Sequence, residues 1–105
     1  MTKVRIEQGI CGFITTVEAT SEDGEEVTVK VESGCGHVMK MLEALGDTFD
    51  SYELCLQKPG CGPLFEYASE NFPSHCGCVA ISGIVKAAEA ECKLALPKNA
   101  SITFE

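Results

Sequence analysis

The sequence is poor in positive charge. Its 105 residues include 8 Lys and Arg against 16 Asp and Glu, which gives a formal net charge of -8 at pH 7. Acidic side chains outnumber basic ones in both halves of the chain. Nucleic acids and anionic membranes attract basic surfaces. Because acidic residues predominate, the chain lacks such a basic surface, and we expect no nucleic-acid partner.

A long apolar run is also missing. No stretch approaches the roughly 20 apolar residues that a membrane-spanning helix requires. The first nine residues, MTKVRIEQG, alternate like a strand and lack the apolar core of a signal peptide. We therefore expect no membrane partner and a cytoplasmic protein, in which cysteine thiols stay reduced.

Common catalytic and nucleotide-binding motifs are absent. The sequence has no P-loop, no GxGxxG and no GxSxG, and its acidic run at residues 22–26 lacks the spacing of an EF-hand. It has no internal repeat, low-complexity segment or linker. A composition of 45% hydrophobic and 23% charged residues is that of a globular protein. We expect one non-enzymatic domain over residues 1–105.

Alternating hydrophobicity predicts three strands in the first third of the chain. Val4 and Ile6 alternate with charged residues, and residues 12–20 are rich in β-branched types. Residues 26–33 alternate strictly, with valine at every second position. The Asp-Gly pair at 23–24 is a turn signal, so the second and third strands are predicted to form a hairpin.

Helical spacing replaces the alternation after residue 36. Apolar residues recur every three or four positions in three further segments, residues 38–45, 63–72 and 81–95. Residues 51–57 are ambiguous, and residues 101–104 are predicted to form a short closing strand. This order indicates an α+β fold, in which a small antiparallel sheet of three to four strands is covered on one face by about three helices.

Seven cysteines are the most informative feature of the sequence. In a reducing compartment they favour metal binding or sulfur chemistry over disulfides. With the hairpin turn centred on Asp23, Val17 faces Val29 and Cys11 faces Cys35, with about 4.5–5.5 Å between facing Cβ atoms. Two thiols are therefore predicted to meet at the open end of the hairpin.

Further cysteines are predicted to approach the same end. Cys76 and Cys78 lie in the loop that leads into the last helix, and Cys35 lies at the start of the first. Helix N-termini stabilise thiolates, the form that binds metal. The spacing is not that of a zinc finger, because the chain has no CxxC pair. Folding must therefore assemble the site from three segments.

We take four cysteines and one histidine as the candidate metal ligands: Cys11, Cys35, Cys76, Cys78 and His75. Each has a structural alternative, such as a facing pair of small buried residues for the first two and an exposed loop residue for the histidine. We also consider His37 as a ligand, and Cys61 as a ligand, a sulfur acceptor or a turn residue. Cys55 and Cys92 lie among apolar neighbours and are expected in the core.

Three motifs in this order resemble the IscU/NifU-type iron–sulfur cluster scaffold. They are G-I-C-G at residues 9–12, G-C-G at residues 34–36 and H-C at residues 75–76 before a long Ala-rich helix. The resemblance implies that Cys11, Cys35 and Cys76 hold a [2Fe–2S] cluster or a zinc ion, with His75 beside them. Phe13 stands where that family has an acidic residue linked to cluster transfer, and the family's leading helix is missing. The chain also resembles an uncharacterised group of small cysteine-containing proteins from anaerobes.

The sequence therefore predicts a metal-binding protein, with an iron–sulfur cluster or zinc as cofactor and a scaffold- or carrier-like role. Its partners would be a cysteine desulfurase, an apo-protein acceptor or a second copy of the chain. One alternative is a sulfur-acceptor protein of the same fold, which carries a persulfide on Cys61 or Cys35. The other is a plain interaction module whose cysteines serve packing.

Overall fold

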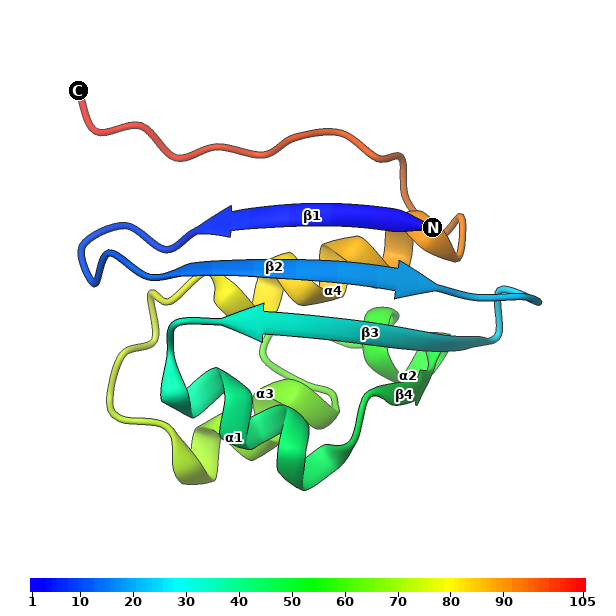
Figure 1. Ribbon diagram of the computed structural model, residues 1–105, viewed down its shortest axis with the longest axis horizontal. Coiled ribbons are helices and arrows are strands. Elements are labelled where there is room, and N and C mark those ends of the chain that lie inside the picture. Colours follow the sequence, from blue (N-terminus) through cyan, green and yellow to red (C-terminus); the bar gives the residue numbers. More distant parts are fainter.

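Four antiparallel strands form one sheet in the order β1-β2-β3-β4 in the computed structural model, which describes residues 1–105 (Figure 1). The strands are β1 (Thr2–Glu7), β2 (Ile14–Thr20), β3 (Glu26–Ser33) and β4 (Thr48–Asp50). The first three lie where alternation predicts them. The three-residue β4, which pairs with β3, precedes the ambiguous segment and has too few residues to show a period.

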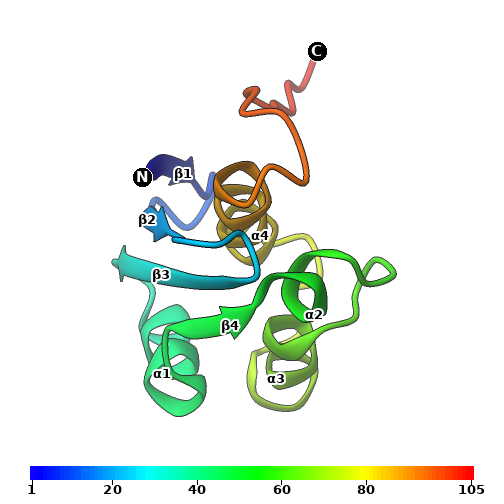
Figure 2. The same ribbon diagram turned by 90° about the vertical axis from the view of Figure 1, so that its right-hand side faces the viewer.

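Four helices complete the α+β fold that the sequence predicts. They are α1 (Gly36–Leu45), α2 (Ser51–Cys55), α3 (Pro63–Asn71) and α4 (Ala80–Glu91). The ambiguous segment supplies α2, so the fold has one helix more than expected. Helix α4 packs across β1, β2 and β3, while α2 packs on α4 and α1 packs on β3 and α3. Figure 2 shows α2, α3 and α4 on one side of the strands.

The core lies between this helical layer and one face of the sheet. Inward-facing residues of the strands, such as Val17 and Val29, are almost fully buried. Helix α4 approaches β1 so closely that a Cβ on Gly83 would lie 2.3 Å from Cδ1 of Ile6. No helix in the structure has both the length and the apolar character that a bilayer span needs.

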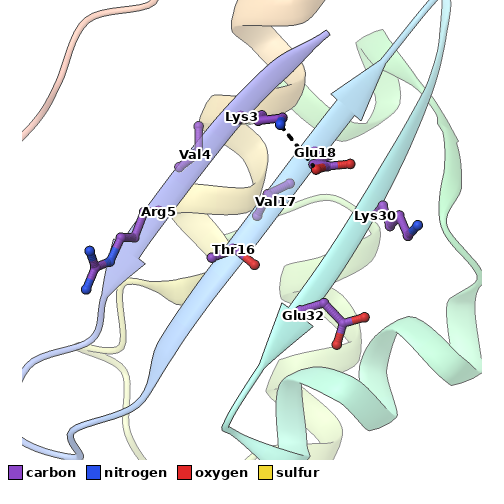
Figure 3. Close-up of a pocket in the computed structure, with 8 residues that line it drawn as sticks. All are labelled: Lys3, Val4, Arg5, Thr16, Val17, Glu18, Lys30 and Glu32. Atoms are coloured by element: carbon purple, nitrogen blue, oxygen red, sulfur yellow. Dashed lines mark ion pairs between the residues drawn. The ribbon is translucent and has the colours of Figure 1, made fainter.

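The other face of the sheet is open to solvent and carries mixed charge. Figure 3 shows a shallow hollow on this face, lined mostly by polar and charged residues of β1, β2 and β3, together with Val4 and Val17. Within it Nζ of Lys3 lies 3.7 Å from Oε1 of Glu18. The hollow is lined by no cysteine, so the open face is separate from the candidate ligands.

The register of the β2–β3 hairpin differs from the predicted one by two residues. Val17 pairs with Val31 and not with Val29. The connection is a loop instead of a tight turn, with Gly24 at φ 76°. Oδ1 of Asp23 accepts hydrogen bonds from the backbone N–H groups of residues 25 and 26, at 2.9 and 3.0 Å. An even shift leaves every side chain on its predicted face, so the alternation alone could not reveal it.

The C-terminal segment also differs from the prediction. Helix α4 ends at Glu91, several residues before the predicted end, because Lys93 adopts φ 60° and turns the chain away. The predicted strand at residues 101–104 is wrong, since residues 96–105 have no regular structure. Ile102 and Phe104 are 77% and 96% exposed. Their alternation has no partner strand, and a strand forms only where a neighbour completes its hydrogen bonds.

Candidate functional site

The three segments that carry the candidate ligands lie at one end of the molecule. Figure 1 shows the β1–β2 loop, the corner between β3 and α1, and the α3–α4 connection all at the end where the arrow of β3 finishes. The first two segments continue from strands and belong to the sheet layer. The third joins two helices and belongs to the helical layer.

Cys35 is the most firmly placed of the candidate ligands. It is the N-cap residue of α1, with an extended backbone at φ -85° and ψ 116°, and its side chain makes no capping hydrogen bond. The residue is half-buried and packs against the hydrophobic core. Its backbone N–H donates a hydrogen bond of 3.0 Å to Oγ of Ser33. The backbone of Cys35 is therefore fixed, while its thiol is free of hydrogen bonds to the helix.

Cys11 lies in a tight loop that two glycines make possible. Gly9 and Gly12 adopt φ 88° and 75°, which other residues rarely do. The N–H of Gly12 donates to the carbonyl of Gly9 at 2.9 Å, and the N–H of Gln8 donates to the carbonyl of Phe13 at 3.1 Å. Cys11 is exposed at the tip of this loop.

Cys11 does not face Cys35, contrary to the predicted register. The two-residue shift of the hairpin pairs Thr15 with Ser33, so the position opposite Cys35 would fall on Phe13 if the register continued. The ring of Phe13 covers Gly34, and a Cβ built there would lie 2.9 Å from the ring. The exposed loop therefore carries Cys11 past the end of the ladder instead of across from Cys35.

A chain of hydrogen bonds nevertheless connects the Cys11 loop to the Cys35 backbone. Nε2 of Gln8 lies 4.0 Å from Sγ of Cys11, and Oε1 of Gln8 accepts a short hydrogen bond from Oγ1 of Thr15. Oγ1 of Thr15 lies 2.7 Å from Oγ of Ser33, which accepts the N–H of Cys35. Two of the candidate ligands are thus joined through three polar side chains.

Sequence reasoning did not identify these three side chains. Thr15 is fully buried on the same face of β2 as Val17 and Ala19, and Ser33 follows the inward valines of β3. Two polar residues at inward positions of neighbouring strands are unusual, because a buried hydroxyl is unfavourable unless it is hydrogen-bonded. That interruption of the apolar pattern was the available signal.

The α3–α4 connection holds the remaining candidates. His75 and Cys76 are exposed, whereas Cys78 is half-buried and packs against the core. The N–H of Cys78 donates to the carbonyl of His75 at 3.3 Å, which closes a turn directly before Val79, the N-cap of α4. None of the three side chains makes a hydrogen bond within the protein.

In this structure no three His, Cys, Asp or Glu side chains are grouped so that they could hold a metal ion. Cys11 and Cys35 are linked through the polar chain, whereas Cys76 and Cys78 belong to the connection between two helices. A metal ion bound by all three segments would require the exposed residues 73–77 of this connection to close towards Cys11 and Cys35.

The other cysteines divide as the sequence predicts. Cys92 is 8% exposed and belongs to the core, and Cys55 packs against it. Burial, the nearby Glu89 carboxylate and Cys92 raise the pKa of Cys55 to about 12, so this thiol stays protonated. Its Sγ lies 3.9 Å from the carbonyl of Val85. Cys61 is exposed in the connection between α2 and α3.

His37 has a packing role in the structure. Its ring lies 5.8 Å from the ring of Phe72, centroid to centroid, at an angle of 46°. This contact joins the first turn of α1 to the end of α3, so His37 helps to hold the two helices together.

Comparison with known proteins gives a family without an assigned activity. The chain belongs to a family of unknown function, DUF6951, whose model matches residues 2–104. No curated protein and no solved structure matches the chain.

Proposed function

We propose that this family member binds a thiophilic metal, either zinc or an iron–sulfur cluster, and acts as a scaffold or carrier for it. Cys11, Cys35 and Cys76 would be the ligands, and Cys78 or His75 would complete the set. Thiolate and imidazole are the donors that zinc and iron–sulfur clusters prefer. The bound group would supply the metal–sulfur chemistry, and the protein would hold and release it.

The observation that carries the proposal is the hydrogen-bonded chain between the Cys11 loop and the backbone of Cys35. It links the thiol of Cys11 to the backbone of Cys35 at the end of the sheet, and both cysteines are flanked by glycines. The order of elements adds support. One cysteine lies between β1 and β2, one between β3 and α1, and one before the last long helix. This is the order that the resemblance to the IscU/NifU-type scaffold implies.

Open space around the cysteines suits a bulky ligand. A Cβ built on Gly12, Gly36 or Gly77 would meet no atom within 4 Å. Each of these glycines follows a candidate ligand, so no side chain crowds the position directly after Cys11, Cys35 or Cys76. A cluster, or a partner that delivers one, could approach at these glycines.

Metal analysis of protein purified without oxygen tests the proposal. We expect zinc or iron with sulfide in near-stoichiometric amount, and we expect Cys11→Ser, Cys35→Ser and Cys76→Ser to release it. The matched control is Cys61→Ser, the same change at another exposed cysteine, which should retain the metal. The proposal fails if the unaltered protein stays metal-free after reconstitution with zinc and with iron plus sulfide, or if Cys61→Ser loses as much metal as the others.

A second candidate function, sulfur acceptance, is favoured by the exposure of Cys61. Its residue is exposed, in contrast to the half-buried Cys55 and the buried Cys92. In this reaction the thiolate of Cys61 attacks the outer sulfur of a cysteine desulfurase persulfide. An S–S bond forms on Cys61, and the desulfurase thiolate leaves. A mass increase of about 32 Da on the peptide with Cys61 supports this function, and an unmodified peptide excludes it.

A further inference from the structure

The hydrogen bonds beneath the Cys11 loop run in a single direction. The N–H of Cys35 donates to Ser33, so the Ser33 hydroxyl proton is free to point to Thr15. The Thr15 hydroxyl then donates its own proton to the carbonyl oxygen of Gln8, whose amide nitrogen points to the sulfur of Cys11. Each hydroxyl accepts one hydrogen bond and donates one, so successive bonds polarise one another.

Packing alone does not account for this chain. Thr15 is 0% exposed and lies beside Val17 on the inward face of β2, where valine has the same shape without a buried hydroxyl. Its partner Ser33 also departs from the run of inward valines in β3. A threonine there is tolerated because both neighbours satisfy its hydroxyl group. Thr15 lies between the Cys11 segment and the Cys35 segment, so its hydrogen bonds connect the two segments.

We propose that Gln8, Thr15 and Ser33 are positioning residues that fix the Cys11 loop relative to Cys35. They would not touch the metal, and only Gln8 would contact a ligand sulfur atom. This inference rests on the proposed function, and it extends that function to the groups behind the ligands. Such outer groups orient metal ligands, and their loss typically lowers metal affinity by 10- to 100-fold.

Replacement of Thr15 gives the sharpest test. We expect Thr15→Val to weaken zinc binding by about 10- to 100-fold in a competition with a chromophoric chelator. The conservative Thr15→Ser, which keeps the hydroxyl, should bind nearly as the unaltered protein does. The matched control is Thr28→Val, which removes the hydroxyl pair between Thr28 and Thr48 at another place in the sheet. It should leave the affinity unchanged.

A purely structural role for Thr15 gives a different outcome. In that case Thr15→Val lowers the denaturant midpoint but leaves the zinc affinity of the folded protein unchanged, and this result overturns the inference. Gln8→Leu provides a second variant, because it breaks the same chain at a half-buried site. It should weaken zinc binding without a large loss of stability.

Amide hydrogen exchange tests the positioning role without any metal. Thr15→Val should speed exchange at Gly12, within the Cys11 loop, and at Cys35, although Thr15 belongs to neither segment. Unchanged exchange at Gly12 contradicts the inference even if the protein binds zinc. If the unaltered protein binds no metal but exchange increases at both amides, the proposed function fails and the positioning role stands.

Discussion

At the scale of single residues, Glu91 ties α4 to the sheet. Its Oε1 accepts a hydrogen bond of 2.8 Å from Oγ1 of Thr2, and its Oε2 accepts one of 3.2 Å from the N–H of Ser21. The Thr2 bond first, then the Ser21 bond and the ammonium group of Met1, lower the pKa of Glu91 from its ordinary value of 4.5. The ionised carboxylate is therefore the form that stabilises the fold.

This lowered pKa predicts a loss of stability in acid. The stabilisation is complete above the pKa of the unfolded chain, near 4.5, and is lost as the pH falls through the lower folded-state pKa. Glu91→Gln should reduce the urea midpoint at neutral pH and flatten its decline in acid. Urea titrations across this range measure both effects, with the exposed Glu70→Gln as control. An acid decline of full size in Glu91→Gln would contradict the assignment.

Gly83 is a second residue whose identity the packing dictates. Alanine is the better helix former, but its Cβ would lie 2.3 Å from Cδ1 of the buried Ile6. We expect Gly83→Ala to lower the free energy of unfolding by about 1–3 kcal/mol, as overpacking does. In a double-mutant cycle with Ile6→Ala, measured by urea unfolding, this cost should shrink. Strictly additive costs would show that the two side chains do not compete for space.

At the scale of elements, the short helix α2 depends on its N-cap. Oδ1 of Asp50 accepts hydrogen bonds from the backbone N–H groups of Tyr52 and Glu53, both at 3.0 Å. Asp50→Ala should lower the free energy of unfolding by about 1 kcal/mol, because it leaves these donors without their partner. The control is Asp47→Ala, since the Asp47 carboxylate bonds only to the Thr48 hydroxyl. Equal effects in chemical denaturation would contradict the capping role.

The elements themselves were largely predictable from the sequence, and the details between them were not. The alternation of valines sets β3, and the spacing of Val38 and Met41 sets α1. The hairpin register depends on how the Asp23 side chain bonds the loop backbone, which no periodicity reports. At residues 101–104 the sequence predicts a strand that does not form, because this segment has an alternating pattern but no partner strand.

At the scale of the whole molecule, the order of the cysteines along the sequence predicts that they lie at the same end of the molecule. It does not predict the distances between their sulfur atoms. The fold brings three connections to one end of the molecule (Figure 1), and these carry Cys11, Cys35 and Cys76. Whether their sulfur atoms meet depends on exposed loops outside the regular elements, whose conformation the pattern does not determine. The hydrogen bond between Thr15 and Ser33 could not be predicted, because only the observed register places the two residues opposite each other.

X-ray absorption at the zinc edge tests most directly whether these segments meet on one ion. For the zinc-loaded protein we predict about three sulfur ligands near 2.3 Å, the usual zinc–sulfur distance. Cys11→Ser and Cys76→Ser should each remove one sulfur from the shell, and Cys61→Ser should remove none. A zinc shell with a single sulfur, or one that Cys11→Ser and Cys76→Ser leave unchanged, would contradict a site assembled from three segments.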